Sequence, residues 1–111
     1  MYKYKAVVTR VVDGDTYDMD VDLGFGLTAD IRVRLNGVDT PETWRPKSEE
    51  ERVHGVEASD FVEALIDKSE VVVHTYKLGL YGRYSADVKL LDGRDLATII
   101  REAGLEKRDH Y

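Results

Sequence analysis

The sequence contains no cysteine, which excludes disulfide bonds, thiolate catalysis and cysteine-ligated zinc. It also lacks an apolar run of the roughly 18 residues that a membrane-spanning helix needs, so we expect no membrane partner. The first residues show no apolar segment followed by a small-residue cleavage site. An intracellular location is therefore the default expectation, and the protein would be secreted if the sequence is a mature form.

An excess of basic residues is also missing. Lysine and arginine number 16 against 22 aspartates and glutamates, which gives a net charge of −6 without a basic tail. Broad attraction to nucleic acid is therefore not expected, and a phosphate backbone would have to be held by local cations. The 111 residues are the size of one domain, which we take as residues 1–111, and we expect a monomer.

Alternation of apolar and polar residues is clearest in the first third of the chain. Tyr17, Met19 and Val21 share one face of a predicted strand, and the intervening aspartates share the other. The same reasoning predicts strands over residues 3–12, 16–23 and 29–36, which would form a three-stranded meander. Two further strands are predicted over residues 70–76 and 84–91.

Two helices complete the pattern. An apolar stripe predicts a helix over residues 56–67; the capping-box spacing of Ser48 and Glu51 indicates an earlier start, whereas Gly55 favours the later one. A short helix is predicted from Leu96 to Ala103, ended by Gly104. The predicted class is mainly β with helices (α+β). Five strands with a helix between the third and fourth suggest a five-stranded OB-fold barrel with a short C-terminal helix.

Two acidic segments are candidates for chemistry. Asp15 follows the parity of the buried face, and a carboxylate placed there needs a partner. Asp39, Thr40 and Glu42 lie in a segment stiffened by Pro41, and carboxylates and carbonyls of this kind suit hard cations such as Ca²⁺. Simpler readings stay open, because Asp15 also fits a turn and the Asp39 segment also fits a helix-start turn.

Two arginines are candidates for phosphate binding. Arg34 precedes Asp39 by five residues, and Arg83 lies in a predicted loop between strands. A guanidinium binds phosphate oxygens in a planar, bidentate way. Either arginine taken alone also fits an ordinary surface charge, and strand parity directs Arg34 away from the apolar face.

Together these segments resemble the staphylococcal nuclease (thermonuclease) family. The matching segments, in chain order, are residues 12–16, 34–43, 55–59, 81–83 and 104–105. The resemblance implies an OB-fold and a calcium-dependent phosphodiesterase that hydrolyses DNA and RNA and leaves 3′-phosphate products, with single-stranded substrate preferred. It implies Asp15, Asp39 and Thr40 as metal ligands, Arg34, Glu42 and Arg83 as catalytic residues, and Tyr81 and Tyr111 as substrate-binding residues.

The sequence departs from this family at a few positions. Leu80 stands where the family often has lysine, and His110 aligns with a nucleotide-stacking tyrosine, for which Tyr111 could substitute. Oxygen ligands also suit Mg²⁺ and Mn²⁺. The alternative hypothesis is a catalytically silent OB-fold domain that binds nucleic acid or another protein, because a fold alone does not establish function.

Overall fold

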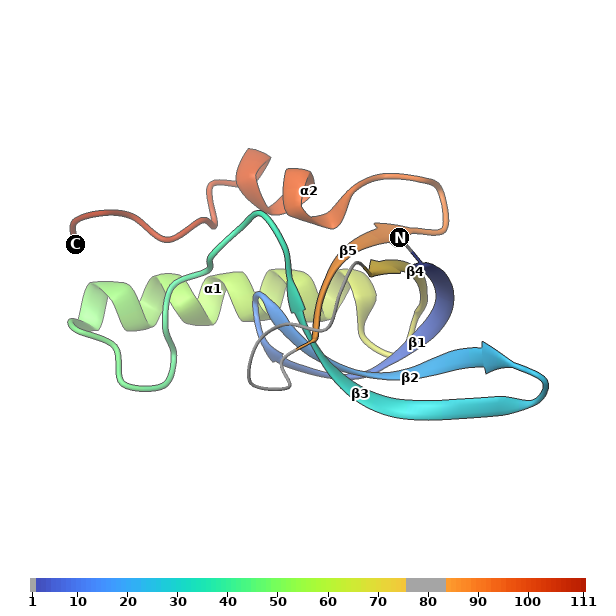
Figure 1. Cartoon of the computed structure of the whole chain (residues 1–111). Helices are drawn as coiled ribbons and strands as arrows, with labels where there is room; N and C mark the ends of the chain where they lie inside the picture. Colours follow the sequence, from blue (N-terminus) through green and yellow to red (C-terminus); the bar gives the residue numbers. More distant parts are fainter. Residues whose placement is uncertain (1, 76–83) are drawn as a thin grey trace.

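The computed structural model describes residues 2–75 and 84–111. Their elements follow the predicted order of three strands, a helix, two strands and a helix (Figure 1). The bounds are β1 Tyr2–Asp13, β2 Thr16–Gly24, β3 Leu27–Leu35, α1 Glu49–Ile66, β4 Glu70–Thr75, β5 Tyr84–Leu90 and α2 Leu96–Glu102.

The strands close into a barrel in the order β1-β2-β3-β5-β4. Neighbouring strands are antiparallel except β3 and β5, which run parallel over three residue pairs from Val33↔Tyr84 to Leu35↔Ala86. Closure leaves no unpaired sheet edge, which a five-stranded open sheet would have. The predicted five-stranded barrel with a helix between its third and fourth strands is confirmed.

The period-two pattern of β2 explains how the barrel is filled. Tyr17, Met19 and Val21 are buried in the core, whereas Asp18 and Asp20 lie on the outer face. Arg32 donates across the β2–β3 ladder to Asp18 at 2.8 Å, and this hydrogen bond lowers the pKa of the Asp18 carboxyl. The acidic face of β2 is therefore a solvated strand face, as the sequence predicts.

Helix α1 begins at Glu49, because the Ser48 side chain accepts the N–H of Glu51 at 3.1 Å as an N-cap. The earlier of the two predicted starts is thus correct. Gly55 does not delay the helix; it is buried where a Cβ atom would come within 2.8 Å of the Pro41 carbonyl oxygen. The later part of α1 packs Ala58, Val62 and Ile66 into the core.

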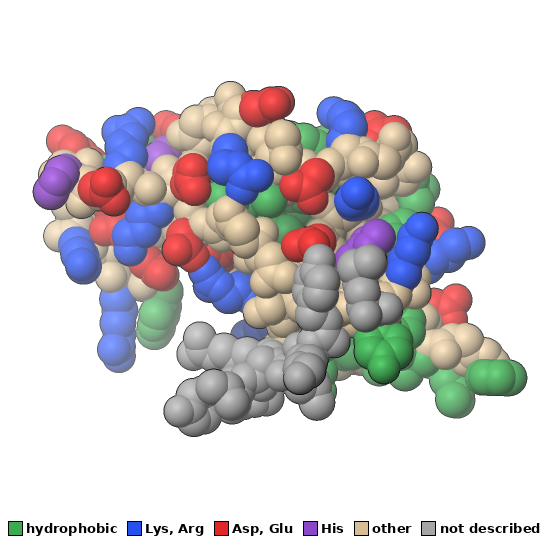
Figure 2. Space-filling view, turned by 45° about the horizontal axis from the view of Figure 1, so that its top comes forward, with side chains coloured by type: hydrophobic (Ala, Val, Ile, Leu, Met, Phe, Trp, Pro, Cys, Tyr) green, Lys and Arg blue, Asp and Glu red, His purple; other side chains and the backbone are tan. Residues whose placement is uncertain are grey.

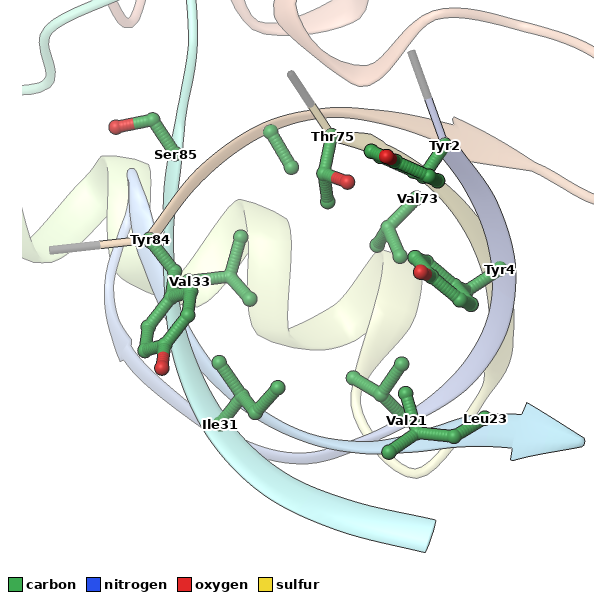
Figure 3. Close-up of a pocket in the computed structure, with 11 residues that line it drawn as sticks. Tyr2, Tyr4, Val21, Leu23, Ile31, Val33, Val73, Thr75, Tyr84 and Ser85 are labelled. Carbon is green, nitrogen blue, oxygen red and sulfur yellow. The ribbon is translucent and has the colours of Figure 1, made fainter. Parts of the chain in front are cut away.

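The end of the barrel that faces away from α1 opens into an apolar pocket with a volume of about 410 Å³. Figure 3 shows the view into it, with residues from all five strands around the wall and α1 behind. Tyr2 and Tyr4 lie side by side at its rim, with ring centroids 6.5 Å apart. The barrel is therefore closed by α1 on one side and open on the opposite side.

Candidate active site

The turn between β1 and β2 carries Asp15, whose side chain is 13% exposed. One carboxylate oxygen accepts the hydroxyl of Thr16 at 3.1 Å, and the other accepts the backbone N–H of Thr40 at 3.1 Å. The backbone carbonyl of Asp15 accepts the N–H of Leu35 at 2.8 Å. These contacts fix the carboxylate on the inner side of the turn, where strand parity predicts it, and join the turn to the end of β3.

Arg34 brings two carboxylates together. Its Cα pairs with Thr16 across the β2–β3 ladder, so its side chain starts on the outer face, as parity predicts. Its Nη2 atom contacts the Oδ1 atom of Asp39 and lies 3.7 Å from the Oδ2 atom of Asp15. Because both oxygens approach the same nitrogen, the two carboxylates converge on one point.

The segment after β3 is packed tightly against the Asp15 turn. Thr40 is 4% exposed, and its side chain lies so close to Gly14 that a Cβ atom there would come within 2.8 Å of it. The Thr40 hydroxyl is buried and has no hydrogen-bond partner among the described residues. Asp39 accepts the N–H of Lys107 at its carbonyl oxygen at 2.7 Å. The two acidic segments are therefore held in fixed relation, and the C-terminal segment supports one of them.

Glu42 lies three residues beyond Asp39 and is exposed. The structure gives its carboxylate no hydrogen bond or ion pair with any residue in the ranges 2–75 and 84–111. Its backbone N–H points inward to the Oε1 atom of Glu51 at 3.4 Å. The backbone of Glu42 is thus anchored while its carboxylate faces solvent.

Glu51 is a buried carboxylate that sequence reasoning did not identify as part of the site. Its side chain is 2% exposed, and its Oε2 atom accepts the N–H of Lys47 at 3.0 Å. The ammonium of Lys107 lies 3.5 Å from its Oε1 atom. The pKa of the Glu51 carboxyl lies below its usual value, mainly because the carboxylate accepts the Lys47 N–H. The Glu42 N–H and the charge of Lys107 add to this effect, and together these groups outweigh burial, which would raise the pKa. Glu51 therefore stays charged and ties the Glu42 loop to the C-terminal segment.

A second contact that the sequence did not reveal joins Asp13 to the same loop. The hydroxyl of Thr43 donates to the Oδ1 atom of Asp13 at 2.5 Å, across 30 residues of chain. No pattern in the sequence points from Asp13 to Thr43. The β1–β2 turn is therefore bonded to the loop that follows Glu42 as well as to Thr40.

Tyr111, the predicted substrate-binding residue, lies against α1. Its hydroxyl is 2.6 Å from the Nδ1 atom of His54, and the Nε2 atom of His54 lies 2.9 Å from the Gly104 carbonyl oxygen. A carbonyl only accepts, so Nε2 carries a proton, and in neutral His54 the Nδ1 atom accepts the Tyr111 hydroxyl. The C-terminal segment runs beside α1 in Figure 1, in agreement with these contacts. A substrate contact of Tyr111 stays a prediction.

The predicted residues Arg83 and Tyr81, and the departure at Leu80, lie outside the described residues. Within the described ranges, no three His, Asp or Glu side chains are grouped to hold one metal ion. The described side chains that converge are thus Asp15, Asp39 and Arg34, with Glu42 nearby along the chain. This arrangement offers two carboxylate ligands for a cation, one guanidinium for an anion and one free carboxylate.

Comparisons with known proteins identify the family of this chain. Residues 32–109 match the family model described as staphylococcal nuclease homologue. The chain is 42% identical over 107 residues to the thermonuclease of Staphylococcus intermedius, and 31% identical over 106 residues to the endonuclease YhcR of Bacillus subtilis. Because the family model matches well over half of the chain, the protein belongs to the staphylococcal nuclease family.

The two relatives differ greatly in length. The matched region is 95% of this chain and 60% of the thermonuclease, but 92% of this chain and only 8% of YhcR. The chain therefore spans less than two thirds of either relative. Among the described residues, no helix is long and apolar enough to cross a membrane.

Proposed function

We propose that this domain is a nuclease that hydrolyses phosphodiester bonds of DNA or RNA and leaves the phosphate on the 3′ side. The observation that carries the proposal is the convergence of Asp15 and Asp39 on the guanidinium of Arg34, in a member of a nuclease family. Phosphodiester hydrolysis needs an activated water and a positive clamp on the anionic transition state. Arg34, near the end of β3, supplies the positive charge, and the neighbouring carboxylates supply groups that can help to activate a water.

We propose that the cofactor is Ca²⁺, with Mg²⁺ or Mn²⁺ as alternatives. The fit rests on the donor set: two carboxylates aimed at one point, beside a segment whose buried Thr40 hydroxyl lacks a partner among the described residues. Hard cations prefer such oxygen ligands. Asp15, Asp39 and the Thr40 carbonyl would hold the ion. When bound, a divalent ion supplies Lewis-acid polarisation of the phosphate and lowers the pKa of a bound water.

The remaining roles belong to side chains of this chain. Glu42, with its exposed carboxylate, would accept a proton from the attacking water. Arg34 would turn from the carboxylates to two phosphate oxygens, since a guanidinium can bridge both. Arg83 would complete the clamp, a role that rests on the family resemblance alone.

The first test is cleavage of a fluorescent single-stranded DNA at low salt, with Ca²⁺ and with a chelator. We expect cleavage only with the metal, and a loss of roughly 10²- to 10⁴-fold in Glu42→Gln, the range typical of removing a general base. Glu63→Gln is the matched control, because Glu63 is also exposed but lies on α1 away from this segment of the chain, and this variant should cleave normally.

Three results would count against the proposal. Undiminished cleavage in chelator would remove the metal from it, and normal cleavage by Glu42→Gln would remove that residue from the mechanism. No cleavage with Ca²⁺, Mg²⁺ or Mn²⁺ by a folded protein would favour the alternative, a catalytically silent domain that binds nucleic acid or protein.

A further inference from the structure

Trp44 is the only tryptophan of the chain, and it is 75% exposed. Single exposed apolar residues are common on protein surfaces, so exposure alone carries no conclusion. Trp44, however, lies two residues after Glu42. Two Cα–Cα steps of 3.8 Å keep its Cα within roughly 7.6 Å of the Glu42 Cα. A large exposed aromatic residue therefore lies close along the chain to a residue of the candidate active site.

The loop that carries Trp44 is anchored at both ends. The two carboxylate oxygens of buried Glu51 accept the N–H groups of Glu42 at 3.4 Å and Lys47 at 3.0 Å, which bracket the loop. The Thr43 hydroxyl donates to Asp13 at 2.5 Å. The loop backbone around Trp44 is thus anchored on both sides, so it loses little conformational freedom when a ligand stacks on the ring.

The next residue, Arg45, has a left-handed backbone with φ of +58° and an exposed side chain. A non-glycine residue in this region is strained, and such strain is often found at ligand sites. Arg45 and Lys47 add two positive charges to residues 43–47, which contain no acidic residue, although the whole chain is acidic. The loop therefore combines an aromatic face with local positive charge.

We propose that Trp44 and Arg45 form a stacking subsite for an unpaired nucleobase of the substrate strand. The proposal rests on the proposed nuclease function and gives a physical reason for the expected preference for single-stranded substrate. Every base has a π-face, so stacking on an aromatic ring tolerates any sequence, and an arginine adds a cation–π contact and a phosphate partner. In a duplex the base faces are already stacked, and this contact is lost.

The charge distribution favours binding of a nucleic-acid strand by stacking over binding by electrostatic attraction alone. On the face shown in Figure 2, Lys and Arg side chains are interleaved with Asp and Glu, without a continuous basic field. With a net charge of −6, the average surface repels a phosphate backbone. A strand held near Glu42 therefore needs contacts that do not depend on the average charge, and Trp44 offers one.

Because Trp44 is the only tryptophan, its fluorescence reports this subsite directly. The wild-type protein is titrated in chelator, so that binding is seen without cleavage, with a thymidine octamer, an abasic octamer of equal length and a blunt duplex. We expect saturable quenching by the thymidine octamer, and much weaker quenching by the abasic octamer and the duplex. Equal quenching by the abasic octamer or the duplex, or no quenching at all, would overturn the proposal.

Variants provide a second readout, measured as anisotropy of a labelled octamer. Trp44→Leu should weaken binding roughly 5- to 150-fold, the range expected for one lost base–aromatic stack, and Trp44→Phe should restore most of the lost affinity. Phe25→Leu is the matched control, because Phe25 is a fully exposed aromatic at the tip of the β2–β3 hairpin. Unchanged affinity in Trp44→Leu, or an equal loss in Phe25→Leu, would refute the subsite.

Kinetics separate this proposal from the proposed function. Trp44→Leu should raise KM for single-stranded DNA while kcat stays near the wild-type value, because a stacked base is bound equally in ground and transition states. A protein that binds through Trp44 but never cleaves would refute the nuclease function alone. A protein that cleaves with a KM independent of Trp44 would refute the subsite alone.

Discussion

Tyr17→Phe tests whether the core of the barrel holds the candidate active site in place. Tyr17 is completely buried in β2, and its hydroxyl donates to the Gly14 carbonyl at 2.5 Å. Gly14 is buried against Thr40 and precedes Asp15. The substitution keeps the ring and removes one donor, so its effect reports the bond between β2 and the Asp15 turn.

The expected loss of stability follows from the burial of both partners. Phenylalanine keeps the apolar contacts, so no large cavity forms, but the Gly14 carbonyl is left buried without this donor. Removing one partner of a buried hydrogen bond costs about 1–2 kcal/mol. For a domain of this size that lowers the melting temperature by roughly 4–8 °C, and the urea midpoint falls by about 0.5–1 M with an unchanged slope.

Alkaline pH gives a second, independent check of the same reasoning. Burial, with Asp15 as the second cause, raises the pKa of Tyr17 well above its usual value. A raised pKa in the folded state contributes stability that is complete below the unfolded value, about 10, and is lost as the pH rises toward the folded value. The stability gap between the wild type and Tyr17→Phe should therefore narrow above about pH 10.

The measurement is urea unfolding followed by circular dichroism at pH 7 and at pH 10.5. Tyr4→Phe is the control, because the half-buried Tyr4 makes a ring contact but no hydrogen bond to the described residues. A midpoint unchanged in Tyr17→Phe, or a loss equal to that of Tyr4→Phe, would refute the argument. A gap that widens at alkaline pH would contradict the direction of the pKa shift.

Two further substitutions test how α1 supports the loop after Glu42. Gly55→Ala should lower the free energy of unfolding by roughly 1–3 kcal/mol in urea unfolding, because the new Cβ would lie 2.8 Å from the Pro41 carbonyl oxygen. At an open helix position the same substitution stabilises by about 1 kcal/mol. A stabilised Gly55→Ala protein would therefore contradict the close packing of Gly55. Glu51→Gln should lower the melting temperature and the cleavage rate, because three donors would then face a neutral amide. Glu50→Gln, at an exposed position, is the control and should change neither. Equal melting curves for the two variants would refute the anchoring role of Glu51.

The strands and the barrel were predictable because local pattern and tertiary burial agree. Tyr17, Met19 and Val21 alternate with aspartates, and a one-residue shift would bury the charged face. The start of α1 was ambiguous because two local rules disagreed. The capping rule was correct, since Gly55 serves close packing against the Pro41 carbonyl, a reason that depends on a contact 14 residues away.

The proximity of Asp15, Asp39 and Arg34 was predictable through the family resemblance, whereas the contacts that support these residues were not, and the roles of all the site residues stay predictions. The convergence of Asp15 and Asp39 on Arg34 agrees with their predicted proximity. The buried role of Glu51 was not predictable, because a glutamate within three consecutive glutamates at a helix start normally faces solvent. The pairing of His54 with Tyr111 spans 57 residues, and no local pattern encodes such a contact.

The two parts of the proposed binding surface, the acidic site and the loop that carries Trp44, differ in charge and would therefore contribute to binding in different ways. Among the described side chains, Arg34 is the cation that contacts Asp15 and Asp39. Glu42, nearby along the chain, adds a third carboxylate, so negative charge is in excess and disfavours a phosphate unless a divalent ion offsets it. The loop carrying Trp44 and Arg45 has the opposite sign. Under the proposed function, a strand would therefore be held first by stacking beside the site, and its phosphate would become attractive to the site only with the metal. Under the same proposal, this division would let an acidic chain act on a polyanion.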